Sequence, residues 1–180
     1  MERFKTLQKA RGFEGVLNLN QGYRSREMSN IYNHFFPSIK AGLSWLAETC
    51  GEQSGITVEV RGGCRTLETG KDINYLLFDF VREMLSYIYE RGDTRNILIS
   101  LARHGKDVEI SVQDDGRGFD VSNRDSLMAC STTYHLLDLH DQIRRVGGRM
   151  GLESEPGVGT RVTVVVPPYA AENGTAGLVM

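Results

Sequence analysis

The stretch Val112-Gln113-Asp114-Asp115-Gly116-Arg117-Gly118-Phe119 decides how this sequence is interpreted. It places an acidic residue and two glycines, Gly116 and Gly118, directly after an alternating apolar run that predicts a β-strand. Asp114 can accept hydrogen bonds, and glycines without Cβ atoms let a flat polar ligand come close to the backbone. Strands that end in an Asp-Gly turn are also common, so a simple turn aspartate is the alternative for Asp114.

Length and composition indicate one soluble domain. The chain has 180 residues, 40% of them hydrophobic, and its net charge of -2 gives no general attraction to nucleic acid or anionic membrane. No apolar run is long enough to span a bilayer, and no signal peptide is present. The three cysteines, Cys50, Cys64 and Cys130, lack the spacing of a zinc site or a disulfide framework. We therefore expect a cytoplasmic protein, or the cytoplasmic part of a larger receptor.

Apolar periodicity predicts an α+β fold. Helices are expected over residues 25–48 with a break near Pro37, over residues 75–90, and over residues 136–146. Strands are expected over residues 56–60, 97–101, 108–112, 150–153 and 161–166. A polar segment over residues 121–133 is long enough to be a functional loop. This order of elements predicts a two-layer α/β sandwich with a mixed sheet.

Several segments together resemble the ATP-binding domain of sensor histidine kinases, in the superfamily with the Bergerat (GHKL) fold. Phe80-Val81-Arg82-Glu83-Met84-Leu85 resembles the N-box helix, and the stretch at residues 112–119 resembles the first glycine box. Residues 143–149 and 160–164 resemble the closing segment. The similarity covers about residues 41–168 and is greatest to kinases that pair with response regulators of the nitrate-regulator type. Outside this range we expect a helical N-terminal segment over residues 1–40, for which a dimerisation remnant is one interpretation, and a flexible tail over residues 169–180.

The resemblance implies ATP or ADP as the ligand and a role for each matching residue. Asp114 would accept the exocyclic amine of adenine, while Gly116 and Gly118 would let the backbone pass close to the base and ribose. Thr160 would support the same edge of adenine. Glu83 would lie beside the phosphates and is the candidate catalytic residue, with a surface acid on an amphipathic helix as the alternative.

Two departures from the family pattern bear on phosphoryl transfer. Tyr87 stands where the family has the asparagine that holds magnesium, and a neutral phenol is a poor ligand for that hard cation. The second glycine box is replaced by Thr133-Tyr134-His135-Leu136, which has no glycine. We therefore expect weak or magnesium-independent nucleotide binding, no metal ligands, and impaired phosphoryl transfer.

Three interpretations of function remain open. The first is the nucleotide-binding domain of a two-component sensor kinase, in signal transduction, whose partners are a response regulator, a kinase or a second copy of itself. The second is an inactive pseudokinase that serves as a protein-binding or dimerising module. The third is a phosphotransferase that uses His34 and keeps a vestigial ATPase domain, although no acidic residue follows His34. None of them involves nucleic acid or membrane contact by this segment.

Overall fold

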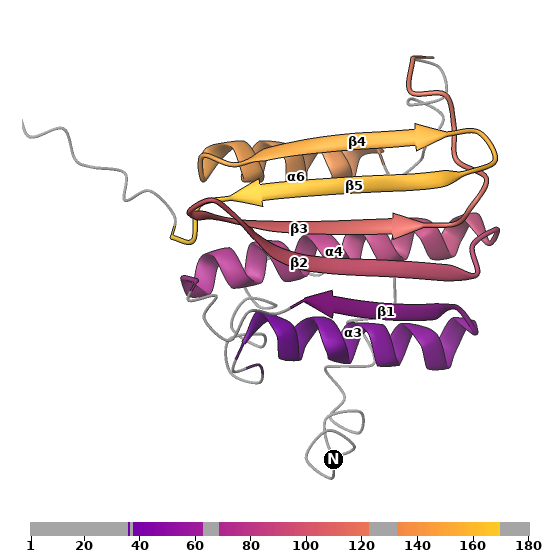
Figure 1. Cartoon of the computed structure of the whole chain (residues 1–180), viewed down its shortest axis with the longest axis horizontal. Coiled ribbons are helices and arrows are strands. Elements are labelled where there is room, and N and C mark those ends of the chain that lie inside the picture. The colour runs from indigo at the N-terminus through magenta and orange to yellow at the C-terminus, as the bar shows by residue number, and fades with distance from the viewer. Residues whose placement is uncertain (1–35, 37, 63–68, 123–132, 170–180) are drawn as a thin grey trace, which may run out of the picture.

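The computed structural model describes residues 36, 38–62, 69–122 and 133–169, and within them a mixed five-stranded sheet carries helices on one face (Figure 1). The strand order is β1-β2-β3-β5-β4; β1 is parallel to β2, and all other neighbours are antiparallel. The predicted α+β sandwich is therefore confirmed. The predicted N-terminal segment and tail lie almost wholly outside the described residues, and so does His34.

The predicted elements in the described part of the chain are present, and most are longer than expected. In chain order they are α3 (Ile39–Ser54), β1 (Thr57–Gly62), α4 (Lys71–Arg91), β2 (Asn96–His104), β3 (Asp107–Asp114), α6 (Thr133–Arg145), β4 (Arg149–Glu155) and β5 (Gly159–Val166). The predicted end of the first helix at residue 48 was wrong. The helix ends at Gly55 in the left-handed conformation (φ 71°), because Thr49 and Cys50 continue its buried face.

Helix α4 forms the centre of the core. Its buried face packs toward the inward side chains of the sheet and comprises Ile73, Leu76, Leu77, Phe78, Phe80, Val81, Met84, Leu85 and Ile88. Burying one such side chain contributes about 1.5–3 kcal/mol, so this face fixes the position of α4. The helix starts before its predicted beginning, since Asn74 donates its backbone N–H to the Gly70 carbonyl at 2.9 Å.

The register of the central strands positions the end of the sheet. On β3, Val108, Ile110 and Val112 face the core, and the next inward residue is Asp114. Because side chains alternate along a strand, a slip by one residue would expose this whole set. The observed register pairs Asp114 with Thr160 of β5, so the sheet itself brings these two residues together.

Candidate functional site

Asp114 is a carboxylate held inside the end of the sheet. It is 8% exposed, and its Oδ1 accepts a hydrogen bond of 2.8 Å from the backbone N–H of Gly116. Burial raises the pKa of Asp114, while the Gly116 N–H and the charge of Arg91 oppose this rise only in part. Thr160, its ladder partner, is 7% exposed. The structure therefore brings together Asp114, Gly116 and Thr160, as the sequence predicts.

The two glycines of the box are held by different constraints. A Cβ on Gly116 would lie 2.8 Å from both Asp114 Oδ1 and Thr94 Oγ1, within the candidate site. Gly118 has a φ of 57°, and a Cβ there would lie 2.1 Å from the Glu155 carbonyl oxygen. Gly118 thus lets the loop pass against the β4–β5 hairpin, and its predicted role toward a nucleotide stays a prediction.

Ser154 is part of this site and was missed by the sequence analysis. Its hydroxyl accepts a hydrogen bond from the Phe119 N–H at 2.9 Å, donates to the Gly159 carbonyl at 3.0 Å, and lies 2.9 Å from Thr160 Oγ1. We call Asp114, Gly116, Ser154 and Thr160 the strand-end cluster. The only available signal for Ser154 was its place in the strand that pairs beside Thr160.

Asp115 has a structural role that the sequence did not reveal. Its Oδ1 accepts hydrogen bonds from the backbone N–H groups of Arg95 at 2.8 Å and Asn96 at 2.9 Å, and its Oδ2 accepts one from Asn96 Nδ2. Although some burial raises the pKa of Asp115, these donors outweigh it and hold the pKa below its ordinary value. Two adjacent carboxyl groups therefore have opposite pKa shifts, because one is buried and the other is held by N–H donors.

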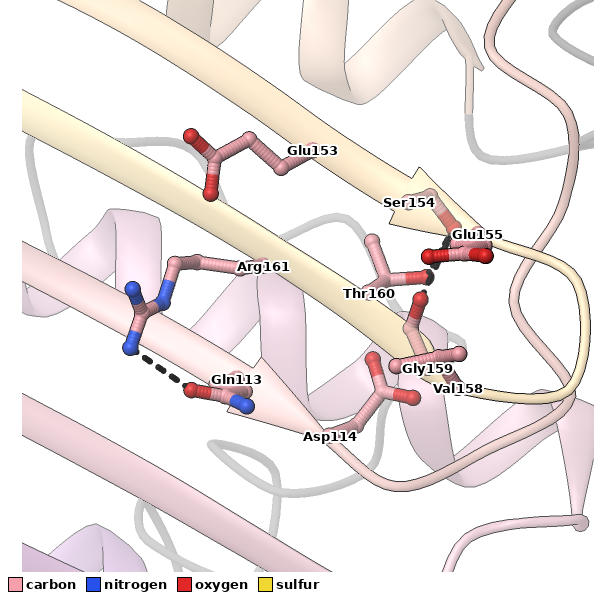
Figure 2. A pocket seen from close by; sticks show the side chains of 9 residues that line it. All are labelled: Gln113, Asp114, Glu153, Ser154, Glu155, Val158, Gly159, Thr160 and Arg161. Atoms are coloured by element: carbon pink, nitrogen blue, oxygen red, sulfur yellow. Dashed lines mark hydrogen bonds between the residues drawn. The ribbon is translucent and has the colours of Figure 1, made fainter.

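A depression of about 330 Å³ crosses the end of the sheet beside Asp114. Figure 2 shows its lining, with Ser154 bonded to Thr160, and Arg161 bonded to Gln113 at 2.7 Å. Gln113 and Arg161 are paired in the ladder one position away from Asp114 and Thr160, so they belong to the opposite face of the sheet. No residue of α4 lines this depression, which therefore does not by itself define a site shared with that helix.

The second group of candidate residues lies on α4. The carboxylate of Glu83 forms an ion pair with its neighbour Arg82, whose guanidinium also binds Asp79 Oδ1 at 2.7 Å. The Glu83 side chain is 14% exposed and that of Arg82 is 21% exposed, so the pair is largely shielded from water. Two turns further along, Arg91 Nη1 donates to the Tyr87 hydroxyl, and the Arg91 guanidinium lies 5.4 Å from the centre of the Tyr87 ring. We call Glu83, Tyr87 and Arg91 the helix cluster.

The end of α4 is joined to the glycine box. Asp93, just beyond the helix, accepts hydrogen bonds from the Arg117 side chain and backbone. Thr94 approaches the Cβ position of Gly116, as noted above. Arg91 consequently lies near Asp114, whereas Glu83 is about 12 Å further along the helix at 1.5 Å per residue. The structure thus gathers Asp114, Gly116 and Thr160, and it leaves Glu83 apart from them.

The remaining polar candidates form no additional site in the described part of the chain. His104 Nδ1 lies 2.9 Å from Glu109 Oε2 at an exposed hairpin, and no group of three or more Cys, His, Asp or Glu residues there could hold a metal ion. The predicted lid lies largely outside the described residues; of the altered glycine box only the helical backbone from Thr133 is described. Among the helices described, none is long and apolar enough to cross a membrane.

Comparison with known proteins identifies the class to which this fold and site belong. A family model described as histidine kinase-, DNA gyrase B-, and HSP90-like ATPase matches residues 72–170. This match covers more than half of the chain, and it includes Glu83, Asp114 and Thr160. The chain belongs to this family of ATPases, and the resemblance to the ATP-binding domain of histidine kinases is confirmed.

Individual relatives agree with this assignment. An uncharacterized sensor-like histidine kinase of Chloroflexus aurantiacus is 30% identical over 99 residues, which are 54% of this chain and 17% of that protein. The sensor histidine kinase LiaS of Bacillus subtilis is 25% identical over 159 residues, which are 85% of this chain and 42% of that protein. The chain therefore spans less than half the length of either relative.

Solved structures support the fold. The histidine kinase domain of the Erythrobacter litoralis EL346 blue-light activated histidine kinase matches with a TM-score of 0.59 at 17% identity, over 73% of this chain and 65% of that one. A second structure of the same kinase matches with a TM-score of 0.60 at 16% identity, over 93% of this chain and 50% of that one. At these identities the similarity establishes the architecture.

Proposed function

We propose that this domain binds ADP and ATP through the strand-end cluster, with Asp114 accepting a hydrogen bond from the exocyclic amine of adenine. The observation that supports this most is the buried Asp114 carboxylate, held in place by the Gly116 N–H. A carboxyl oxygen can accept more than one hydrogen bond, so the bond from Gly116 is compatible with a ligand amine. Thr160 would support the same edge of the base, and Gly116 and Gly118 would let backbone and ligand approach each other.

In the full-length protein, we propose that this domain serves a two-component sensor kinase in signal transduction. Its partners would be a response regulator of the nitrate-regulator type or a kinase, and a second copy of the chain through the N-terminal segment. The similarity to LiaS and to a second sensor-like kinase supports this class of protein. A cytoplasmic location would follow from the same role.

Phosphoryl transfer is proposed to be impaired. Catalysis of this step depends mainly on positioning the phosphates and stabilising their charge. The Glu83 carboxylate is ion-paired with Arg82 and lies about two turns from Arg91. The Tyr87 hydroxyl already accepts a hydrogen bond from Arg91. The same observations favour the second candidate, an inactive module that binds a protein partner or dimerises and has kept the ATPase fold.

Calorimetric titration of the chain with ADP tests nucleotide binding. Asp114→Asn should weaken binding about 10- to 100-fold, because it removes a charged acceptor from the base site. Asp107→Asn is the matched control, since it makes the same change at the other end of β3. Equal affinity of wild type and Asp114→Asn would refute the assignment of Asp114. Absence of heat with ADP and ATP would favour the inactive module instead.

A further inference from the structure

Arg91 is a cation fixed on a rigid support beside the strand-end cluster. It is the last residue of α4, one turn after Tyr87, and its guanidinium both donates to the Tyr87 hydroxyl and lies against the Tyr87 ring. Tyr87 is itself 6% exposed, so its ring is held by the core. Cation–π contact and a hydrogen bond to one buried residue restrict the side chain of Arg91 before any ligand arrives.

Arg91 lies near two carboxyl groups, those of Asp114 in the glycine box and of Asp93 just after α4. The turn after α4 contacts this box, because Asp93 binds Arg117 and Thr94 approaches Gly116. The charge of Arg91 acts on both carboxyl groups: it opposes the rise in the pKa of Asp114 and contributes to the lowered pKa of Asp93. An adenine nucleotide bound at Asp114 would therefore lie next to a fixed positive charge, and Arg91 is only half-buried.

The residues present do not fit a magnesium ion at this helix. Magnesium requires compact oxygen ligands in near-octahedral geometry. Here the Glu83 carboxylate is ion-paired with Arg82, and the Tyr87 hydroxyl accepts a hydrogen bond from Arg91. The Glu83 carboxylate and the Tyr87 hydroxyl are thus each engaged by a guanidinium group, and a divalent cation between them would meet two positive charges.

We propose that Arg91, positioned by Tyr87, binds the phosphates of the nucleotide in place of magnesium, so that this domain binds metal-free ADP and ATP. A guanidinium carries five N–H donors in a planar fork that matches phosphate oxygens, and it can hold a phenol and a phosphate together. It remains charged at every pH at which the domain is folded. This inference rests on the proposed binding of adenine nucleotides at Asp114.

The test measures the affinity of the whole chain for ADP and for adenosine, each with EDTA and with excess magnesium. For the wild type, ADP should bind with the same affinity within about twofold in both conditions, and more tightly than adenosine. Arg91→Gln should weaken ADP binding about tenfold or more and change adenosine binding less than about threefold, because it removes a charged bond to phosphate only. Arg103→Gln removes the same charge from the exposed far end of β2 and is the control.

Two further variants sharpen the test. Tyr87→Phe keeps the ring under the guanidinium and removes the hydrogen bond, so it should weaken ADP binding less than Arg91→Gln does. Tyr87→Asn removes the support and adds an amide oxygen, so ADP binding should fall in EDTA and recover with magnesium. A thermal melt of each variant confirms that it is folded.

The outcomes distinguish failure of the role proposed for Arg91 from failure of the nucleotide binding on which it rests. A tenfold or larger increase in wild-type affinity on adding magnesium would overturn the role of Arg91, and this measurement needs no variant. Unchanged ADP affinity in Arg91→Gln would overturn it as well. If Asp114→Asn still weakens ADP binding in that case, the proposed nucleotide binding at Asp114 remains supported. If neither ADP nor adenosine binds the wild type, both proposals fail.

Discussion

The strand-end cluster and the helix cluster are built in different ways. Asp114, Ser154 and Thr160 are joined by backbone donors, carbonyl acceptors and ladder register, so the sheet itself sets their positions. Glu83, Tyr87 and Arg91 are held by contacts between side chains of α4: Glu83 pairs with Arg82, and Arg91 contacts Tyr87. A site built on backbone constraints persists with the fold, whereas contacts between side chains of a helix depend on which side chains are present.

The largest effect is expected at Gly118, where the backbone beside the strand-end cluster is most constrained. Gly118→Ala should destabilise the fold by at least about 3 kcal/mol, because it combines a left-handed φ with a Cβ placed 2.1 Å from a backbone oxygen. Gly157→Ala is the matched control. Its φ is 81° but no atom lies within 4 Å of the added Cβ, so a loss of about 1–2 kcal/mol is expected.

Urea unfolding of the two glycine variants measures this difference. Equal losses of stability would mean that the loop moves freely away from the β4–β5 hairpin. Backbone constraints would then not hold the region beside the strand-end cluster in place, and its contrast with the helix cluster would be wrong at Gly118.

A smaller effect is expected at Ser154. Ser154→Ala removes the acceptor of the Phe119 N–H and the donor to the Gly159 carbonyl, and it should cost about 1–2 kcal/mol. It should also weaken ADP binding, since Thr160 loses its hydroxyl neighbour. Ser122→Ala, whose exposed hydroxyl contacts only Asp120 among the bonds described, should change stability by a few tenths of a kcal/mol. Equal stability of both variants would show that Ser154 does not hold the cluster.

The sequence was sufficient for the elements and for the residues that lie directly on them. Apolar periodicity predicted α4 and the final hairpin, because burial of one face dictates both patterns. Strand register then placed Asp114 opposite Thr160, two residues to which the resemblance gave roles at the same edge of adenine. Ser154 was not predictable, since its bonds to Phe119 and Thr160 depend on a register that no local pattern encodes.

The contacts of the helix cluster were partly accessible from sequence. Tyr87 and Arg91 are four residues apart, a spacing that places two helical side chains on one face and so makes a contact between them accessible from sequence. The resemblance placed Glu83 beside the phosphates, but adjacent residues of a helix do not normally face each other, so the sequence did not indicate its pairing with Arg82. The ion pair between them results from burial of both side chains together with Asp79.

The smallest expected effect compares Asp114 of the strand-end cluster with its neighbour Asp115. The folded-state pKa of Asp115 is below its ordinary value of 3.8, so Asp115 stabilises the fold above pH 3.8, and this contribution is lost as the pH falls through the folded-state pKa. The folded-state pKa of Asp114 is raised above 3.8, so its charge costs stability above that pKa, and the cost disappears as the pH falls below 3.8.

Urea unfolding at pH 7 and at pH 3.5 should therefore give effects of opposite sign for two chemically equal substitutions. At pH 7, Asp115→Asn should lower stability, by less than about 1 kcal/mol because the side chain is exposed, while Asp114→Asn should raise it. Both differences should shrink at pH 3.5. A loss of stability for both variants at pH 7 would mean that the Asp114 carboxylate is stabilised by its donors more than burial penalises it. The presence of an aspartate at position 114 would then need no ligand to explain it, because the fold alone would account for a charge there.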